Sequence, residues 1–362
     1  MFNGKLASNS LAPFPTRLPT FQAVSASQAS HKAANVTKSY TNTLATIIRN
    51  MKKIIIILSL TFSFQIYSQE KLNVLILQNE YAHDVHIITD VFEEVLNKTG
   101  NYSIDKFFVQ EKEDWEKFNY NFKDYQLIIS SRLGGDMPEK LRNELVYYIT
   151  NGGNLAITHQ GVSSFYDWPK FHEIIGLGWY ESDAGEHIFW NESRGDFVRT
   201  PLFHGVGVGH GKQHEFLVTM RDTEHPISKS IPVEWIQSKD ELYHGLRGPA
   251  KNITIIATAY SDKKTWGSGD HEPIAWTSNY GKGRIFVTVL GHVMKEEYKD
   301  AINGINSCEN KNEAIYSVGF QTLFARGAEW AATGKVSIEI PDNFPSKTES
   351  SSVEPSKVKW KK

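Results

Sequence analysis

The stretch DMPEKLRNELVYYITNGGNLAITHQ (residues 136–160) contains a helix, a turn and a strand in direct succession. Asp136 and Pro138 are typical of a helix start, because an Asp side chain caps the first backbone N–H groups and Pro has no N–H to satisfy there. The Asn-Gly-Gly turn at 151–153 ends the helix, and the apolar run at 154–158 predicts a buried strand. The expected inner face of the helix consists of Leu141, Leu145, Val146 and Ile149.

The same alternation of helix and strand extends outward from this stretch. The further predicted elements are strands at 72–77, 102–108, 125–130, 253–259, 274–277 and 284–290, and helices at 84–98 and about 314–332. Strands that alternate with helices at this spacing predict an α/β fold with a parallel sheet covered on both faces. We therefore expect one α/β domain that carries a long insertion at roughly 160–250.

The N-terminal part of the chain is not expected to belong to this domain. Residues 1–50 contain no Asp or Glu, and Met51-Lys52-Lys53 then precedes a short apolar run that ends near Ser68. This is the pattern of a secretory signal peptide, which we place at 51–68. Residues 1–50 are either a transit-like extension or upstream codons translated in error, and we favour Met51 as the true start. The protein is then secreted or periplasmic, with no stable membrane anchor.

The C-terminal end and the charge balance limit the remaining classes. Residues 341–362 are rich in Ser, Pro, Lys and Glu, so we predict a disordered tail and place the α/β domain at 69–340. The whole chain has a net charge of −2, and residues 71–362 hold 32 Lys and Arg against 40 Asp and Glu. No basic face is indicated, and we expect no nucleic-acid partner.

Polar side chains follow several predicted strands at the point where each strand ends. Ligands of open α/β sheets bind outside the carboxyl ends of the strands, so these residues are expected to meet at one edge. Imidazoles set beside glycines at strand ends, as at His159 and His292, are better candidates for catalysis than a histidine elsewhere. The residues at the predicted edge are Glu80, His83, Arg132, His159, Gln160 and His292.

Two further groups carry candidate chemistry. The Gly-rich run HGVGVGHGKQH (204–214) holds His204, His210 and His214, which form either a metal loop or a lid. In the segment DELYH (240–244), strand-like alternation places Glu241 and Tyr243 on one face as an acid/base pair, although an exposed polar turn would show the same residues.

The sequence lacks the residues that several common enzyme mechanisms require. The single cysteine, Cys308, follows no predicted strand, which excludes a disulfide scaffold and argues against thiol catalysis. No Gly-x-Ser-x-Gly elbow occurs, and no Gly-x-Gly-x-x-Gly follows the first strand, so neither a serine hydrolase nor a nicotinamide enzyme is indicated. The remaining chemistry is proton transfer by His, Tyr and Glu, with a divalent metal as the one cofactor it can use and no nicotinamide or flavin.

The chain resembles the trehalose-utilisation (ThuA-like) family over about 71–335. The matching motifs are GGNLAITH (152–159), HPI (225–227), DELYH (240–244), PIAW (273–276), YGKGRIFVTVLGH (280–292), GFQ (319–321) and RGAEW (326–330). The resemblance implies a flavodoxin-like, class I glutamine amidotransferase-like three-layer sandwich and a link to carbohydrate metabolism. The position that holds a nucleophilic Cys in the amidotransferases is His159 here, so amidotransferase activity is not implied.

These observations together predict an exported lyase or dehydratase that acts on oligosaccharides from a uronic-acid-containing polysaccharide. We expect His159 and His292 to act as base and acid, Tyr243 as their partner, and Glu241 as an orienting residue or metal ligand. Arg132 is expected to hold the substrate carboxylate. The other expected substrate contacts are Glu80, His83, Gln160, His244 and Trp276, the last as one of six tryptophans in or near the insertion. The alternatives are a hydrolase or isomerase of keto-sugar glycosides and a non-catalytic sugar-binding protein.

Overall fold

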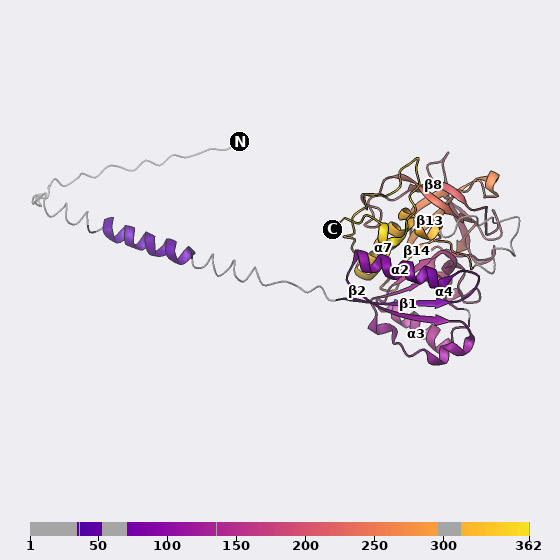
Figure 1. Cartoon of the computed structure of the whole chain (residues 1–362), viewed down its shortest axis with the longest axis horizontal. Coiled ribbons are helices and arrows are strands. Elements are labelled where there is room, and N and C mark those ends of the chain that lie inside the picture. The colour runs from indigo at the N-terminus through magenta and orange to yellow at the C-terminus, as the bar shows by residue number, and fades with distance from the viewer. Residues whose placement is uncertain (1–34, 36, 53–70, 135, 296–312, 362) are drawn as a thin grey trace, which may run out of the picture. The chain divides into compact units, whose positions relative to one another are not determined.

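The computed structural model describes residues 35, 37–52, 71–134, 136–295 and 313–361 (Figure 1). The chain divides into two compact units, Met1–Ser68 and Gln69–Lys362. In the first unit, residues 37–52 are helical and exposed. The predicted signal peptide lies almost wholly outside the described residues, since only 51 and 52 of it are included. Among the described residues, no helix combines the length and apolar character needed to cross a membrane.

The second unit is built on a mixed sheet whose parallel half has the strand order β2-β1-β3-β4-β14. These strands are β1 (Leu72–Asn79), β2 (Tyr102–Val109), β3 (Leu127–Ser130), β4 (Leu155–Thr158) and β14 (Gly283–Thr288). The inner strands β3 and β4 consist entirely of buried residues, as a parallel sheet covered on both faces requires. The predicted α/β class is confirmed.

Antiparallel strands continue this sheet in the order β13-β12-β8-β9. They are β13 (His271–Tyr280), β12 (Ile253–Tyr260), β8 (His214–Met220) and β9 (Glu234–Asp240). Two of them, β8 and β9, come from the segment predicted as an insertion, so that segment is partly built into the main sheet. The rest of it forms β5 (Glu186–Asn191), β6 (Asp196–Thr200), β7 (Gly209–His210), β10 (Tyr243–His244) and β11 (Arg247–Gly248).

Helices cover both faces of the sheet. Helix α2 (Val85–Thr99) packs on α7 (Val318–Thr333), which follows the short α6 (Glu313–Tyr316), and the rings of Phe92 and Phe324 stack at 4.3 Å between them. Helix α3 (Glu139–Thr150) lies on the other side of β1 from α2 (Figure 1). Helix α4 (Pro169–Ile175) packs on β13, where its last carbonyl accepts a hydrogen bond from Trp276. Short 3₁₀ turns complete the unit: η1 (Lys112–Lys117), η2 (Phe122–Asp124), η3 (His159–Ser163), η4 (Lys263–Thr265) and η5 (Pro355–Lys357).

Two predictions from the sequence are wrong in this part of the structure. Helix α3 begins at Glu139 with Pro138 as its N-cap residue, and no side chain caps it, because Asp136 lies two residues too early. The segment 341–361, predicted as a disordered tail, is ordered against the domain. Its backbone is hydrogen-bonded to β9 and to the start of α7. The Ser346 carbonyl accepts from the N–H of Ile236 (2.9 Å), and the Ser351 carbonyl accepts from the N–H of Val318 (2.8 Å). The few apolar residues of the segment are enough because they meet an apolar surface that is already formed.

Candidate functional site

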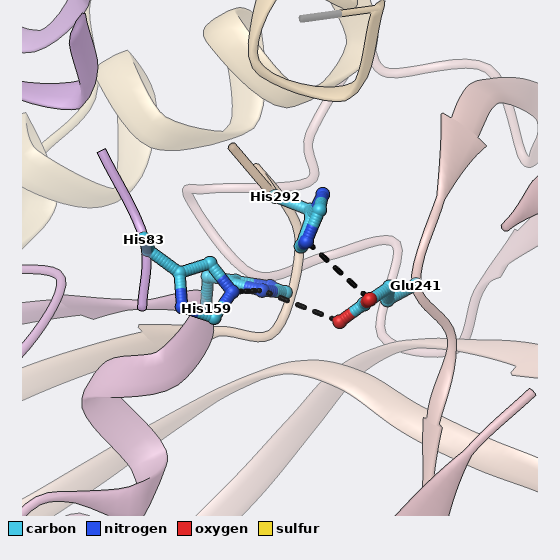
Figure 2. Close-up of side chains that lie close together, drawn as sticks. All are labelled: His83, His159, Glu241 and His292. Atoms are coloured by element: carbon cyan, nitrogen blue, oxygen red, sulfur yellow. Dashed lines mark hydrogen bonds and ion pairs between the residues drawn. The ribbon is translucent and has the colours of Figure 1, made fainter. Parts of the chain in front are cut away.

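Four buried side chains meet at the carboxyl edge of the parallel strands: His83, His159, Glu241 and His292 (Figure 2). His83 follows β1, His159 follows β4 directly, and His292 follows β14. Because β1, β4 and β14 are parallel and lie within four neighbouring strands, their carboxyl ends point to the same edge. Glu241 reaches the group from the opposite side, directly after the antiparallel strand β9.

His159 occupies a sharp turn between β4 and the following 3₁₀ turn. Its φ of 43° lies in the left-handed region, which non-glycine residues seldom adopt and which is frequent at functional sites. The side chain is fully buried, and Nδ1 lies 2.8 Å from the carbonyl oxygen of Val289. A carbonyl can only accept, so Nδ1 carries the proton and Nε2 presents a lone pair to the centre of the cluster.

The donor atoms of the four side chains face one another. His159 Nε2 is 3.1 Å from His83 Nε2 and 3.7 Å from Glu241 Oε2. His292 Nε2 is 3.3 Å from Glu241 Oε1. One ligand atom from each residue lies within 4.8 Å of all the others. Three imidazoles and a carboxylate at such spacing are a donor set that suits a transition-metal ion.

Burial sets the charge of this cluster. It lowers the pKa of His83 to about 4 and lowers that of His159 well below the usual range, so both imidazoles are neutral at neutral pH. Burial also raises the pKa of Glu241, the only acid of the cluster. The contact between His159 and Glu241 is therefore not an ion pair between two full charges.

A second layer of polar groups fixes the backbone and the rings of the cluster. The buried Asp240 carboxylate accepts hydrogen bonds from the backbone N–H groups of Glu241 (2.8 Å), Gly291 (2.9 Å) and His292 (3.3 Å). Desolvation raises the pKa of Asp240 to about 7. The side-chain amide of Gln213 lies 2.8 Å from His292 Nδ1, which leaves Nε2 turned toward Glu241.

Tyr243 brings a hydroxyl group to the same place. This hydroxyl lies 3.0 Å from His159 Nε2, and the tyrosine ring packs edge-to-face against Trp179 at 4.9 Å. Burial raises the pKa of Tyr243 well above its ordinary value, so the hydroxyl keeps its proton at neutral pH. His210 lies beside it and is a quarter exposed; its Nδ1 is 2.9 Å from the Gly211 carbonyl, so a neutral His210 imidazole has its lone pair on Nε2.

Arg132, which follows β3, adds a cation to the rim of the site. Its guanidinium stacks over the Tyr81 ring at 4.4 Å and interacts electrostatically with His83 and Tyr243. Burial lowers the pKa of Arg132. Its Nε has no hydrogen-bond partner, and no carboxylate within the described ranges pairs with it. A half-buried guanidinium without a counter-charge is costly, and an anionic ligand would relieve that cost.

Comparison with known proteins places the chain in a family. A family model described as ThuA, trehalose utilisation, matches residues 73–303. The chain belongs to the ThuA family. The fold is similar to the crystal structure of a ThuA-like protein from Parabacteroides merdae, with a TM-score of 0.70 and 35% sequence identity over 79% of this chain and 99% of that one. The predicted resemblance and the class I glutamine amidotransferase-like fold are thereby confirmed.

Other comparisons add less. A second ThuA-like protein, from Bacteroides uniformis, is 18% identical with a TM-score of 0.45 over 75% of this chain and 95% of that one. The search of curated proteins returned no match. The family therefore gives the fold and a plausible link to carbohydrates, and the chemistry has to be argued from the residues of the site.

The structure brings together most of the residues that the sequence predicted for this site. His159, His292, Tyr243 and Glu241 are in mutual contact, and Arg132 lies beside them. His83, predicted as a substrate contact, belongs to the cluster itself. Gln160 is buried next to His83, whose pKa it raises by a hydrogen bond. His86, three residues after His83, is exposed, lies outside the cluster and bonds to Glu80.

Three residues predicted to contact the substrate lie outside the four-residue cluster. Trp276 is fully buried in the core, where its indole N–H donates to the Ile175 carbonyl, so its prediction as a sugar platform is wrong. Glu80 is held by Lys295 (2.9 Å) and Gln110 (2.8 Å), outside the four-residue cluster. His244 points toward the opposite side of β10 from Tyr243, where Glu272 raises its pKa against the larger lowering by burial.

Of the two alternatives for the Gly-rich run, a metal loop and a lid, the metal loop is not formed. His204, His210 and His214 do not gather around one point within the described residues: His204 is exposed and bonds to the Leu202 carbonyl, and His214 bonds to the Lys212 carbonyl. The Gly-rich run instead places His210 in β7, which pairs with β10 and so brings it next to Tyr243. Sequence reasoning missed Asp240 and Gln213, which support the cluster from outside. Asp240 precedes Glu241 in the motif quoted above, and Gln213 carried no signal.

Proposed function

We propose that this chain is a carbohydrate-active enzyme that acts on an acidic sugar by elimination, as a carbon–oxygen lyase. The observation that carries this proposal is the position of Arg132, a half-buried cation without a carboxylate partner that faces the same cluster as Tyr243. A guanidinium binds a carboxylate through two parallel hydrogen bonds, and a uronic acid supplies that group. The family's trehalose-utilisation name supports a sugar as the substrate class.

The chemistry requires one base and one acid. With the carboxylate held by Arg132, the neighbouring C–H becomes more acidic, and His210 Nε2 takes that proton. The electron pair of the C–H bond forms a carbon–carbon double bond, and the adjacent C–O bond breaks. The departing oxygen takes the proton of the Tyr243 hydroxyl, which burial keeps protonated at neutral pH. The products are an unsaturated acid and either water or the next sugar.

This assignment differs from the one suggested by the sequence. His159 Nε2 faces His83 and Glu241, and His292 Nε2 faces Glu241, so neither nitrogen points outward. In the proposal, His159 positions Tyr243 through the 3.0 Å contact of its Nε2 with the tyrosine hydroxyl, and Arg132 stabilises the enolate-like charge that develops on the substrate carboxylate. Tyr243, which carries a hydroxyl proton, and His210, which is a quarter exposed, take over proton transfer in the proposal.

Incubation of the purified full chain with uronate-containing oligosaccharides tests the proposal. Elimination produces a double bond conjugated with the carboxylate, and ultraviolet absorbance then rises with time. New reducing ends without absorbance would indicate a hydrolase, and binding without either signal would indicate a sugar-binding protein; both results contradict elimination. The exposed His204 provides a matched control, because His204→Ala should leave the rate unchanged whereas His210→Ala should lower it.

Export is the second part of the proposal. It is supported by the basic, apolar and small residues in succession at 51–68, and an extracellular polysaccharide is a natural source of acidic oligosaccharides. N-terminal sequencing of the protein secreted or released from the producing cell tests it. A start near Gln69 is expected, and a start upstream of Met51 in the active protein would contradict it.

A further inference from the structure

The four-residue cluster at the centre of the site has the donor atoms of a metal site. Three imidazoles and the Glu241 carboxylate each offer one ligand atom, and these four atoms all lie within 4.8 Å of one another. We propose that His83, His159, His292 and Glu241 bind one divalent transition-metal ion. Figure 2 shows the rings and the carboxylate turned toward the same small volume from four separate segments of the chain.

The distances match a single ion. Zinc–nitrogen and zinc–oxygen bonds are about 2.0–2.2 Å long, so neighbouring ligand atoms of a tetrahedral site are roughly 3.3–3.6 Å apart. His83 Nε2 and His159 Nε2 are 3.1 Å apart, His292 Nε2 and Glu241 Oε1 are 3.3 Å apart, and His159 Nε2 and Glu241 Oε2 are 3.7 Å apart. Changes of a few tenths of an ångström would bring all four donors onto one ion.

The outer shell is the one that metal-bound histidines usually have. The ring N–H opposite the ligating nitrogen normally donates to a carbonyl or an amide oxygen, which fixes the tautomer. His159 Nδ1 donates to the Val289 carbonyl in this way; His292 Nδ1 lies 2.8 Å from the Gln213 amide nitrogen, and a rotation of that amide by 180° would place its oxygen there as the acceptor. Asp240 fixes the backbone of Glu241 and His292 together.

Buried side-chain atoms without a hydrogen-bond partner give a second, independent indication of a metal site. Glu241 is 3% exposed, yet its Oε1 has no hydrogen-bond partner among the described residues. The Tyr243 hydroxyl and His83 Nε2 both lie close to the single lone pair of His159 Nε2, at 3.0 Å and 3.1 Å, and the buried His83 Nδ1 has no hydrogen-bond partner among the described residues. A bound cation satisfies the carboxylate oxygen and lets His83 carry its proton on Nδ1, beside Gln160.

The donor set selects the kind of metal. Three imidazoles suit zinc, iron, cobalt, nickel and copper, whereas magnesium and calcium prefer sites made only of oxygen ligands. No thiolate lies in the cluster. We therefore expect Zn²⁺ or a similar first-row ion. The ion would supply the positive charge that stabilises the enolate-like intermediate; this role rests on the proposed function, whereas metal binding does not.

The test measures binding on the full chain without any substrate. The chain is treated with a chelator, dialysed, loaded with Zn²⁺ or Co²⁺, and analysed for metal by mass spectrometry. We expect one ion per chain and, with Co²⁺, the visible absorption of a four- or five-coordinate ion. Glu241→Gln and His292→Ala should each weaken binding by more than the ~10–100-fold that a change in the outer shell costs, and Gln213→Ala by an amount within that range.

The control is His204→Ala, which removes an exposed imidazole outside the cluster and should keep one ion per chain. Each variant is checked by circular dichroism, and the unmodified chain decides the question if a variant does not fold. The proposal would be overturned if the unmodified chain retained neither Zn²⁺ nor Co²⁺. It would also be overturned if folded Glu241→Gln and His292→Ala variants bound the ion as tightly as the unmodified chain. Stoichiometric binding without any absorbance change on acidic sugars would leave the metal site standing and contradict only the proposed elimination.

Discussion

The carboxylate of Asp240 accepts a hydrogen bond of 3.3 Å from the backbone N–H of His292, although the two residues are 52 positions apart. The same carboxylate accepts from the N–H groups of Gly291 and Glu241. One buried side chain therefore ties the end of β9 to the loop after β14 and holds a carboxylate and an imidazole of the cluster at a fixed separation. Gly291 makes the loop feasible, because its φ of 100° and the Phe320 ring 2.7 Å from where a Cβ would lie exclude other residues.

Replacing this carboxylate should loosen the site more than it unfolds the domain. In Asp240→Asn one oxygen remains as an acceptor, but the amide NH₂ group opposes backbone N–H donors that are buried. We expect a loss of about 1–3 kcal/mol in the free energy of unfolding, measured by urea denaturation, and roughly 10–100-fold weaker metal binding. The exposed Asp90 on α2 is the matched control, and Asp90→Asn should change neither quantity. Unaltered metal affinity in Asp240→Asn would show that Asp240 does not position the ligands.

The Tyr243 hydroxyl should be needed for turnover and dispensable for folding. In Tyr243→Phe the ring and its contact with Trp179 remain, and only the hydroxyl 3.0 Å from His159 Nε2 is lost. A general acid contributes about 10²–10⁴-fold, so we expect kcat to fall by that factor while KM changes little. The exposed Tyr147 offers a control, since Tyr147→Phe should leave the kinetics unchanged. A Tyr243→Phe variant with nearly full kcat would assign the proton to another group.

The edge of the sheet at which the site forms was predictable from the sequence, because parallel strands present their carboxyl ends together. That rule places His83, Arg132, His159 and His292 near one another without any knowledge of side-chain directions. Trp276 was predicted on a different ground, as a tryptophan near the insertion, and it lies within a strand with its indole N–H bonded to the last carbonyl of α4. Strand alternation also predicted correctly that Glu241 and Tyr243 reach the same neighbour, since both approach His159 Nε2.

The roles of the histidines could not be derived in the same way. Whether an imidazole faces solvent or another imidazole depends on ring orientation, which Val289 and Gln213 determine here through hydrogen bonds across more than 70 residues. The ordered packing of the C-terminal segment could not be predicted from the sequence either. Its composition is that of a disordered chain, and only the apolar surface contributed by Trp235 explains why it packs.

The guanidinium of Arg132 should strengthen substrate binding and contribute nothing to the free energy of unfolding, or lower it. In Arg132→Gln the charge is lost but the amide can still donate one hydrogen bond to a substrate carboxylate, so the net loss is about 1.5–3 kcal/mol and KM for a uronate should rise by roughly 10–100-fold. Because the cation has no carboxylate partner among the described residues, the free energy of unfolding should stay constant or rise by about 1 kcal/mol. Arg199, which pairs with Glu186 on the surface, is the control. A large loss of stability in Arg132→Gln would instead point to a structural role.

The C-terminal segment should contribute measurably to the stability of the domain. The Phe344 ring packs edge-to-face on Trp235 at 5.5 Å, and Trp235 in turn lies against α7, where a Cβ on Gly319 would meet its ring at 2.1 Å. Because Phe344 is only half-buried, Phe344→Ala should lower the free energy of unfolding by about 2 kcal/mol, less than the ~3–5 kcal/mol of a fully buried Phe. Urea denaturation measures this, with the exposed Glu349→Ala as the control. Equal stability of the two variants would mean that the segment 341–361 does not pack on the domain in solution.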